Sequence, residues 1–246
     1  MRLVRHLWEA ALNLVYPPSC FGCGRPTTRP QFCRSCAAAI EPPRSPLCVT
    51  CGVPFQTSDD ADHPCSRCLQ APPRFGRARA CTIYDGSDAV VHPLKSVLQR
   101  YKYNRDVGLA KPLAQLVHER CPLRLADYDV LMPVPLHLTR LRWRGFNQAQ
   151  LLLGTLAPAS GRPVDAMSLQ RLRPTRPQVE LNEAERRRNV AGAFHVTTPE
   201  HVRGRRILLF DDVYTTGATV NDCSRALLRA GARSIDVLVL ARAVVR

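Results

Sequence analysis

Two adjacent aspartates followed by a turn rich in threonine and glycine form the most informative chemical pattern in the sequence. Asp211 and Asp212 follow the apolar residues 207–210, and two residues later comes the turn Thr215, Thr216, Gly217, Ala218 and Thr219. Carboxylates accept hydrogen bonds from sugar hydroxyls, and a divalent cation can screen them from a nearby phosphate. Backbone N–H groups and hydroxyls at the start of a helix bind phosphate, and a glycine permits close approach. The pattern therefore predicts a site for a phosphorylated sugar with a divalent cation.

Eight of the eleven cysteines form a second chemical pattern, because they fall into four C-x-x-C pairs. The pairs are Cys20 with Cys23, Cys33 with Cys36, Cys48 with Cys51, and Cys65 with Cys68. Two such pairs complete a tetrahedral thiolate site for zinc, and a site with four protein ligands is structural. We expect one or two zinc ions, with pairing in sequence order or interleaved. Disulfides are the alternative, and a reducing compartment disfavours them.

The other cysteines and one nearby histidine need a separate interpretation. His63 lies close enough to Cys65 in sequence to replace a ligand, although eight cysteines already suffice. Cys81, Cys121 and Cys223 are isolated, and we expect them to be small core residues.

Strands and helices alternate after residue 80, and they must position the aspartates. We expect strands over residues 80–84, 128–135, 205–210 and 234–243, and helices over 89–101, 107–119, 147–156 and 219–229, the last capped by Gly231. Residues 205–210 include an apolar run without alternation, which is typical of a strand buried on both faces of a parallel sheet. The fold class is therefore α/β, and ligands bind such sheets at the carboxyl ends of the strands.

Composition limits the remaining possibilities. The 246 residues are 45% hydrophobic and carry a formal net charge of +15. This excludes a mainly disordered chain, and no run is long enough to span a membrane. The first residues predict an amphipathic helix that ends before Pro17, without a signal-peptide pattern, so we expect a cytoplasmic protein. The charge favours polyanionic partners. We place a helix and zinc module in residues 1–75 and the α/β domain in residues 76–246.

The strand, the acids and the turn together resemble the signature of type I phosphoribosyltransferases. That resemblance implies a type I phosphoribosyltransferase-like parallel sheet with helices on both faces, preceded here by a small module like a double zinc ribbon. It also implies binding of 5-phosphoribosyl 1-pyrophosphate (PRPP) with magnesium. Asp211 and Asp212 would hold the ribose 2- and 3-hydroxyls, and residues 215–219 would hold the 5-phosphate.

The order of features along nearly the whole chain resembles the ComF family of competence-associated proteins. The match includes the four C-x-x-C pairs and the segments YKYNRD (101–106), PVPLH (133–137), RGFNQ (144–148), RPTRPQVEL (173–181) and RRNVAGAF (187–194). In the first segment, Asn104 and Arg105 replace an expected arginine and glycine. The resemblance implies a role in DNA uptake during natural transformation, with single-stranded DNA and DNA-processing proteins as partners.

Several basic residues are candidates for binding the pyrophosphate. The PVPLH segment follows a strand, where a type I enzyme has its pyrophosphate loop, and positive charge comes from Lys102, Arg140, Arg142 and Arg144. A further arginine-rich segment could form a lid or a track for a nucleic-acid backbone. It contains Arg171, Arg173, Arg176, Arg186, Arg187 and Arg188, together with the polar residues Gln178 and Asn189.

Three functions remain open at this stage. The first is a phosphoribosyltransferase in which Asp211, Asp212 and Lys102 carry the catalytic work and Arg144 helps to bind PRPP. Its acceptor would be chosen by a hood formed by residues 81–85 with parts of the zinc module. The second is a non-catalytic protein that binds single-stranded DNA or acts as an adaptor and uses the domain to sense a ligand. The third is a zinc scaffold with a degenerate domain, and the intact acids and turn argue against it.

Overall fold

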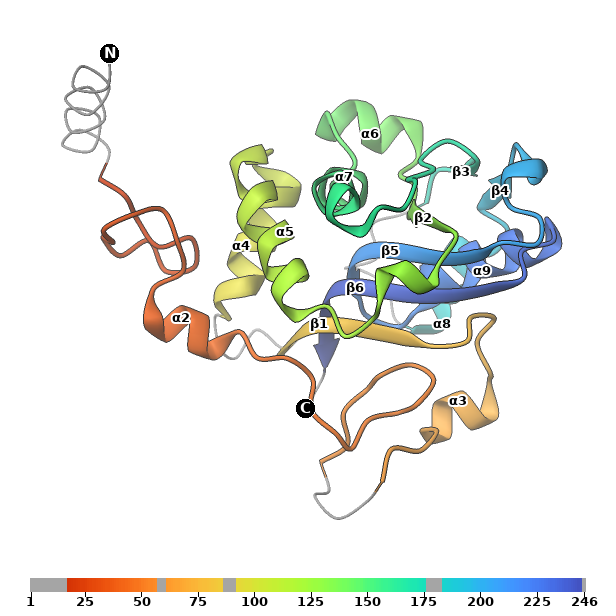
Figure 1. The fold of residues 1–246 in the computed structure, drawn as a ribbon, viewed down its shortest axis with the longest axis horizontal. Coiled ribbons are helices and arrows are strands. Elements are labelled where there is room, and N and C mark those ends of the chain that lie inside the picture. The colour runs from red at the N-terminus through yellow and green to blue at the C-terminus, as the bar shows by residue number, and fades with distance from the viewer. Residues whose placement is uncertain (1–16, 57–60, 86–91, 176–182, 245–246) are drawn as a thin grey trace.

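A four-stranded parallel sheet forms the centre of the molecule. A computed structural model describes residues 17–56, 61–85, 92–175 and 183–244. The strands β1 (Ala78–Asp85), β2 (Val130–Pro133), β5 (Arg206–Tyr214) and β6 (Ser234–Val244) lie in the order β1-β6-β5-β2, and all three pairings are parallel (Figure 1). A separate antiparallel pair consists of β3 (Leu169–Arg171) and β4 (Phe194–Val196). The predicted α/β class is confirmed.

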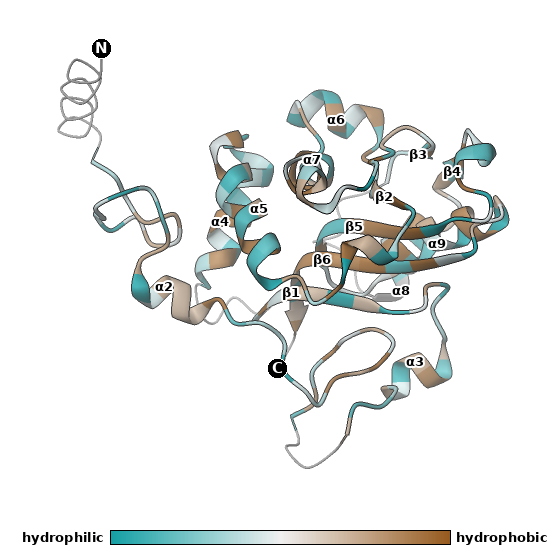
Figure 2. Cartoon of the chain, in the orientation of Figure 1, coloured by the Kyte–Doolittle hydropathy of each residue, from teal (hydrophilic) through white to brown (hydrophobic). Residues whose placement is uncertain are grey.

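Helices cover both faces of this sheet. On one face, α4 (Pro93–Tyr103), α5 (Ala110–Arg120) and α7 (Gln148–Ser160) share a core with Leu208 and Phe210 of β5. On the other face, α9 (Ala218–Arg229), α8 (Glu183–Val190) and the β3–β4 pair contribute to a core with Ile207 and Leu209. Because successive side chains of β5 enter opposite cores, the run has no polar face. Figure 2 shows apolar stretches along both β5 and β6.

Of the predicted strands, β5 extends furthest beyond its predicted bounds. β5 continues through both aspartates to Tyr214, since β6 keeps pairing with it as far as Tyr214 opposite Arg242. Residues 81–85 belong to β1, at the edge of the central sheet, so the expectation that they form a hood is wrong. Of that segment, Tyr84 does line the cavity described below.

The helices predicted for the α/β domain are present, but several of their ends differ from the predicted positions. A short turn, η1 (Val107–Leu109), precedes α5, and α7 extends to Ser160 beyond its predicted end. The remaining short elements are η2 (Leu125–Asp127), α6 (Leu138–Arg144) and η4 (Pro199–His201). Gly231 follows α9 with φ of +92°, and the N–H of the next residue donates to the carbonyl of Leu227, as in a Schellman cap. The predicted N-terminal helix lies outside the described residues.

The cysteine-rich segment consists of two copies of one small unit. Each unit has a loop with a C-x-x-C pair and then a short helix that carries the next pair, α2 (Arg34–Ala39) or α3 (Ser66–Gln70). Corresponding bridges, Ser19 with Pro26 and Leu47 with Pro54, close the two loops. Gly24 and Gly52 have φ of +72° and +71°, which explains a glycine after each first pair. Figure 1 shows α2 and α3 far apart, with α2 nearer α4 and α3 below β1.

None of the helices within the described ranges combines the length and apolar character that crossing a membrane would require.

Candidate functional site

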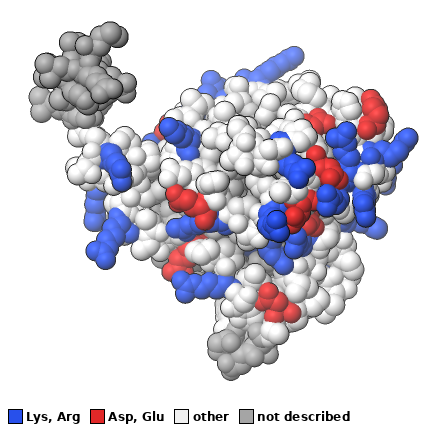
Figure 3. Space-filling view, viewed as in Figure 1, with Lys and Arg blue, Asp and Glu red and all other residues white. Residues whose placement is uncertain are grey.

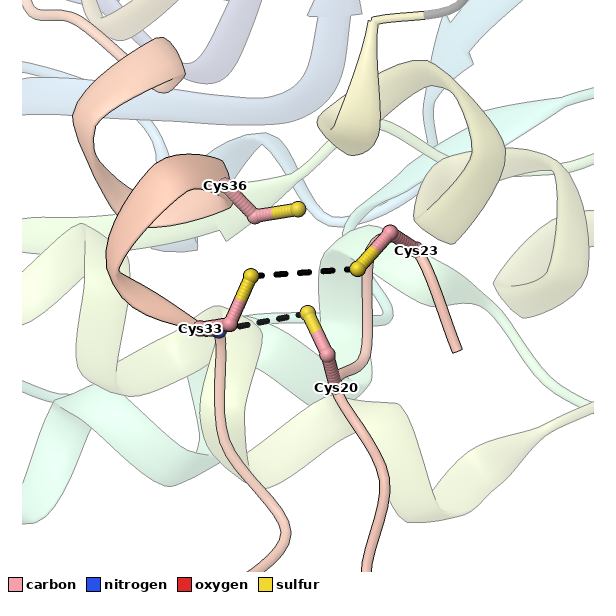
Figure 4. Close-up of side chains that lie close together, drawn as sticks. All are labelled: Cys20, Cys23, Cys33 and Cys36. Carbon is pink, nitrogen blue, oxygen red and sulfur yellow. Dashed lines mark hydrogen bonds between the residues drawn. The ribbon is translucent and has the colours of Figure 1, made fainter. Parts of the chain in front are cut away.

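The eight cysteines form two separate clusters in sequence order. Within each cluster the Sγ atoms all lie within 4.8 Å of one another, and the members are Cys20, Cys23, Cys33 and Cys36, then Cys48, Cys51, Cys65 and Cys68. In the first cluster, the four side chains point toward a common centre, two from the loop and two from α2 and the residue before it (Figure 4). The interleaved pairing is thereby excluded.

Both clusters have dimensions that fit zinc. A tetrahedral ion with bonds of about 2.3 Å to sulfur places its ligands roughly 3.8 Å apart. The Sγ atoms of Cys23 and Cys33 are 3.7 Å apart, and those of Cys51 and Cys65 are 3.8 Å apart. Backbone N–H groups donate to Cys20 Sγ from Cys33 and to Cys48 Sγ from Cys65, at 3.2 and 3.3 Å. Such bonds favour thiolates, so these are two structural zinc-binding sites, each with four cysteine ligands.

The remaining cysteines and His63 stay outside these clusters. The His63 ring stacks on Phe55 at 4.2 Å, and its Nδ1 lies 2.9 Å from the carbonyl of Ala61. Cys81 and Cys223 are buried in the two cores, as expected, whereas Cys121 is half-buried.

A cavity of about 560 Å³ opens at the carboxyl ends of β2 and β5. This is the edge at which open parallel sheets bind ligands. The predicted site residues that line it are Asp211, Asp212, Lys102, Arg140, Arg144, Arg171, Thr215, Gly217, Ala218 and Thr219. Thr216 is not among the lining residues, although its carbonyl accepts a hydrogen bond from Arg67 at 3.4 Å.

The two aspartates share one cationic partner. Lys102, from α4, places its Nζ atom 3.0 Å from Oδ1 of Asp212. Burial and the charge of Asp212 raise the pKa of Asp211 to about 7, although Lys102 opposes this rise. Burial lowers the pKa of Lys102, but the two carboxylates outweigh it and raise that pKa overall. The ammonium group therefore stays charged beside the acid pair.

Buried arginines also line the cavity. Arg144 is only 5% exposed and Arg171 only 8%, and within the described residues the Nε atom of each has no hydrogen-bond partner. Burial lowers the pKa of both groups, but a guanidinium remains charged at any physiological pH. The Arg144 guanidinium lies 5.5 Å from the Tyr103 ring centroid, and that of Arg171 lies 5.3 Å from the Phe194 ring centroid. Buried donors without partners suit an anionic ligand.

Tyr214 shapes the turn between β5 and α9. Gly217 is the N-cap of α9 with φ of +78°, and a Cβ atom there would lie within 2.5 Å of Cζ of Tyr214 and closer still to its hydroxyl. Thr216 Oγ1 accepts a bond from the N–H of Ala218 at 3.4 Å. The glycine is thus required by the backbone and by Tyr214, in addition to the phosphate approach expected from sequence.

The PVPLH segment is held rigidly beside this turn. The N–H of Val134 donates to the carbonyl of Phe210, and Asn147 donates from Nδ2 to the carbonyl of Val134 at 3.0 Å. Asn147 also caps α7, and His137 caps α6. The prediction of a rigid loop at the end of β2 agrees with these contacts.

The YKYNRD segment shows why a glycine is expected at position 105. Arg105 has φ of +56°, and no other non-glycine residue in the described part of the chain has a positive φ. Its guanidinium lies 5.9 Å from the centroid of Trp143 and donates to the Trp143 carbonyl. Arg105 thus adopts the left-handed conformation and contacts the aromatic residue at the cavity rim.

Some sequence candidates lie elsewhere. Arg142 does not line the cavity, and Arg173 donates to the carbonyls of Asn189 and Ala191. Arg176 and Gln178 lie outside the described residues, as do the side chains of Arg186 and Arg187. Sequence reasoning assigned no binding role to three aromatic lining residues, which are Tyr103, Trp143 and Tyr214.

Comparison with known proteins places the chain in a family. Residues 11–69 match the model described as a double zinc ribbon domain. The "DNA utilization protein YhgH" of Escherichia coli (strain K12) is 34% identical over 236 residues, covering 93% of this chain and 99% of that protein. "Competence protein F" of Haemophilus influenzae is 31% identical over 218 residues, covering 86% and 90%. This chain belongs to the ComF family. Its sequence resemblance to that family is therefore confirmed.

Solved structures give a weaker likeness than these ComF relatives. Glutamine PRPP amidotransferase from B. subtilis matches 54% of this chain and 26% of its own length, with 22% identity and a TM-score of 0.34. Adenine phosphoribosyltransferase from Thermoanaerobacter pseudethanolicus matches 56% and 83%, with 13% identity and a TM-score of 0.35. The α/β fold of this ComF protein is shown by its own parallel sheet and the helices on both faces.

Proposed function

We propose that this ComF-family protein binds PRPP with magnesium in the cavity at the carboxyl ends of β2 and β5, and that it acts in DNA uptake. The observation that carries the proposal is that two aspartates, two buried arginines and residues of the turn 215–219 at the start of α9 line one cavity. A volume of about 560 Å³ lies within the range of small-ligand sites. The names of the relatives support the biological role.

Each chemical group of PRPP has a matching part of the cavity. Asp211 and Asp212 accept hydrogen bonds from the two ribose hydroxyls, and magnesium screens them from the phosphates. The turn of residues 215–219 at the start of α9 holds the 5-phosphate, with Gly217 lining the cavity. Arg144 and Arg171 receive the pyrophosphate through donors that are otherwise without partners. Lys102 supplies a positive charge beside the acid pair and opposes the rise of the Asp211 pKa.

If transfer occurs, the protein would act by charge placement. Departure of pyrophosphate leaves positive charge on the ribosyl centre, which the aspartates stabilise, while the arginines stabilise the leaving group. The incoming nitrogen nucleophile would then form the new bond to the ribosyl carbon. Among the described residues, no side chain is needed as a nucleophile in this scheme. Pyrophosphate release with added amines or bases distinguishes a transferase from a ligand sensor.

Calorimetric titration with PRPP and magnesium tests the proposal. Wild type should bind, and Asp211→Asn with Asp212→Asn should weaken binding at least tenfold. Asp127→Asn is a matched control because Asp127 is exposed and does not line the cavity. Ribose 5-phosphate should lose affinity with the aspartate variants, and pyrophosphate with Arg144→Gln. A wild type that binds none of the three ligands would overturn the proposal.

A second function, single-stranded DNA binding, is favoured by the aromatic rim of the cavity. Tyr103 and Trp143 are 49% and 51% exposed, their ring centroids are 6.3 Å apart, and Arg105 and Arg144 lie over them. Exposed aromatic rings beside arginines suit base stacking. Figure 3 shows further basic side chains scattered over the face of the molecule that it presents, among fewer acidic ones.

Fluorescence anisotropy with a single-stranded oligonucleotide tests this second function. Trp143→Ala should weaken binding several-fold, whereas Leu69→Ala, which removes an exposed apolar side chain from α3, should not. Affinity should fall steeply with added salt if the backbone is contacted. Equal affinity for wild type and Trp143→Ala would exclude stacking at the rim.

A further inference from the structure

The second cysteine cluster is part of the core beneath the sheet. Cys48, Cys51 and Cys68 are buried and pack in one hydrophobic cluster with β5, β6 and α9. The first cluster contributes no cysteine to either core cluster. A structural metal site inside the core can hold more than its own small unit in place.

Arg242 connects this second cluster to the end of β5. Its side chain, from β6, is only 4% exposed. Nη1 donates to the carbonyl of Cys51 at 2.5 Å, Nη2 lies 3.7 Å from Cys51 Sγ, and the guanidinium lies 4.4 Å from the ring centroid of Tyr214. Four thiolates around a divalent ion carry net negative charge, which suits a buried guanidinium. Arg242 therefore fixes Cys51 on one side and the Tyr214 ring on the other.

Tyr214 in turn borders the turn that we assign to the 5-phosphate. Its ring occupies the space beside Gly217 that a Cβ atom would need, and it also makes a T-shaped contact with Phe75, with ring centroids 6.5 Å apart. If this ring moved, residue 217 would lose the side chain that packs beside it.

Arg67 makes a second connection from the same ribbon. It lies in α3, between Cys65 and Cys68, and its Nη2 donates to the carbonyl of Thr216 at 3.4 Å. The N–H of Arg74 also donates to Asn221 of α9 at 2.6 Å. The ribbon thus contacts both the turn and the helix that follows it.

We propose that Arg67 and Arg242 are positioning residues through which the second zinc ribbon holds the turn of residues 215–219 in its phosphate-binding conformation. This inference rests on the proposed function for its ligand, but the order of the turn can be measured without any ligand. Because binding energies are linked, a ligand in the cavity and zinc in the second cluster should strengthen each other to the same degree.

The test compares Arg67→Gln and Arg242→Gln with Arg79→Gln in the full chain. Arg79 is the matched control because it donates to the carbonyl of Val49, within the same C-x-x-C loop, and does not line the cavity. Amide hydrogen exchange of residues 215–219 should speed up several-fold in Arg67→Gln and Arg242→Gln and stay unchanged in Arg79→Gln. PRPP affinity should fall about tenfold in the same two variants, and Arg67→Lys should recover part of it.

Zinc retention gives an independent measurement. At equilibrium with a chromophoric chelator, PRPP should increase zinc retention at one of the two sites in wild type but not in Arg242→Gln. Unchanged exchange of residues 215–219 in both variants would overturn the inference, even if PRPP binds normally. If wild type does not bind PRPP, the proposed function fails, and the exchange measurement still decides whether the ribbon orders the turn. Arg67→Gln keeps the test decisive if Arg242→Gln does not fold.

Discussion

The ammonium group of Lys102 lies 3.0 Å from Oδ1 of Asp212, so the acid pair of the cavity has a built-in counterion. The contact joins α4 to β5, two elements that are more than one hundred residues apart in sequence. Two neighbouring carboxylates repel each other when both are ionised, and a close cation reduces that repulsion. The contact therefore prepares the site for a ligand that needs both carboxylates as acceptors.

Removal of Lys102 should destabilise the protein more than removal of the whole ion pair. Lys102→Met should lower the free energy of unfolding by about 2–4 kcal/mol, because it leaves the Asp212 carboxylate buried without its partner. Adding Asp212→Asn to Lys102→Met should restore part of this loss. Urea denaturation at pH 8 measures both values. A double variant no more stable than Lys102→Met alone would contradict the pairing.

The raised pKa of Asp211 should make stability depend on pH. A carboxyl group whose pKa rises to about 7 on folding destabilises the native state as pH rises from about 4 to 7, and the loss stays constant above that. Asp211→Asn removes this effect and keeps an oxygen that can accept from the N–H of Asp212. The variant should therefore be more stable than wild type by about 1–3 kcal/mol at pH 8.

The same comparison at pH 4 is the control for Asp211→Asn. Wild-type Asp211 is protonated there in the folded protein, so the two unfolding free energies should converge. A stability gain that is equal at pH 4 and pH 8 would show that packing, rather than ionisation, is responsible. Increased stability of this binding-site variant would also show that the Asp211 carboxylate lowers the free energy of unfolding of the wild-type protein.

Local patterns predicted zinc binding by the eight cysteines and the strand, turn and helix around Asp211. The C-x-x-C spacing alone brings two thiolates to one ion, and the apolar residues 207–210 need both faces of a sheet buried. The division into two clusters in sequence order could not be predicted, because either pairing uses the same eight ligands.

Contacts between elements that are far apart in the chain could not be predicted from the sequence. The role of Lys102 depends on how α4 packs against β5, and the role of Arg242 depends on the second ribbon packing beneath the sheet. The extension of β5 to Tyr214 required knowledge of its pairing with β6, since Asp211 and Asp212 look like the end of an apolar strand. Trp143 and Tyr103 meet only because α6 lies beside the end of α4.

The left-handed backbone at Arg105 should make glycine better than alanine at that position. Arg105→Gly and Arg105→Ala both lose the contacts with Trp143, but only alanine keeps the strain of a positive φ. Arg105→Gly should therefore be more stable than Arg105→Ala by about 1 kcal/mol. Thermal unfolding measures the difference.

A matched pair of glycine and alanine variants in a regular helix should show the opposite order of stability. Gln115 is exposed near the middle of α5, so Gln115→Gly should be less stable than Gln115→Ala by about 1 kcal/mol. If Arg105→Gly were also less stable than Arg105→Ala, the result would contradict a positive φ at position 105.

Gly217 should tolerate a methyl group less well than other left-handed glycines, because of Tyr214. Gly161 has φ of +64°, and no neighbouring atom lies within 4 Å of the position that a Cβ atom would take there. Gly161→Ala therefore measures the backbone strain alone, about 1 kcal/mol. Gly217→Ala adds the collision with the Tyr214 ring and should lower the free energy of unfolding by roughly twice as much or more. In a Tyr214→Ala background the additional loss at residue 217 should fall to the value at residue 161. An unchanged loss in that background would mean that contacts other than Tyr214 exclude a side chain from the turn.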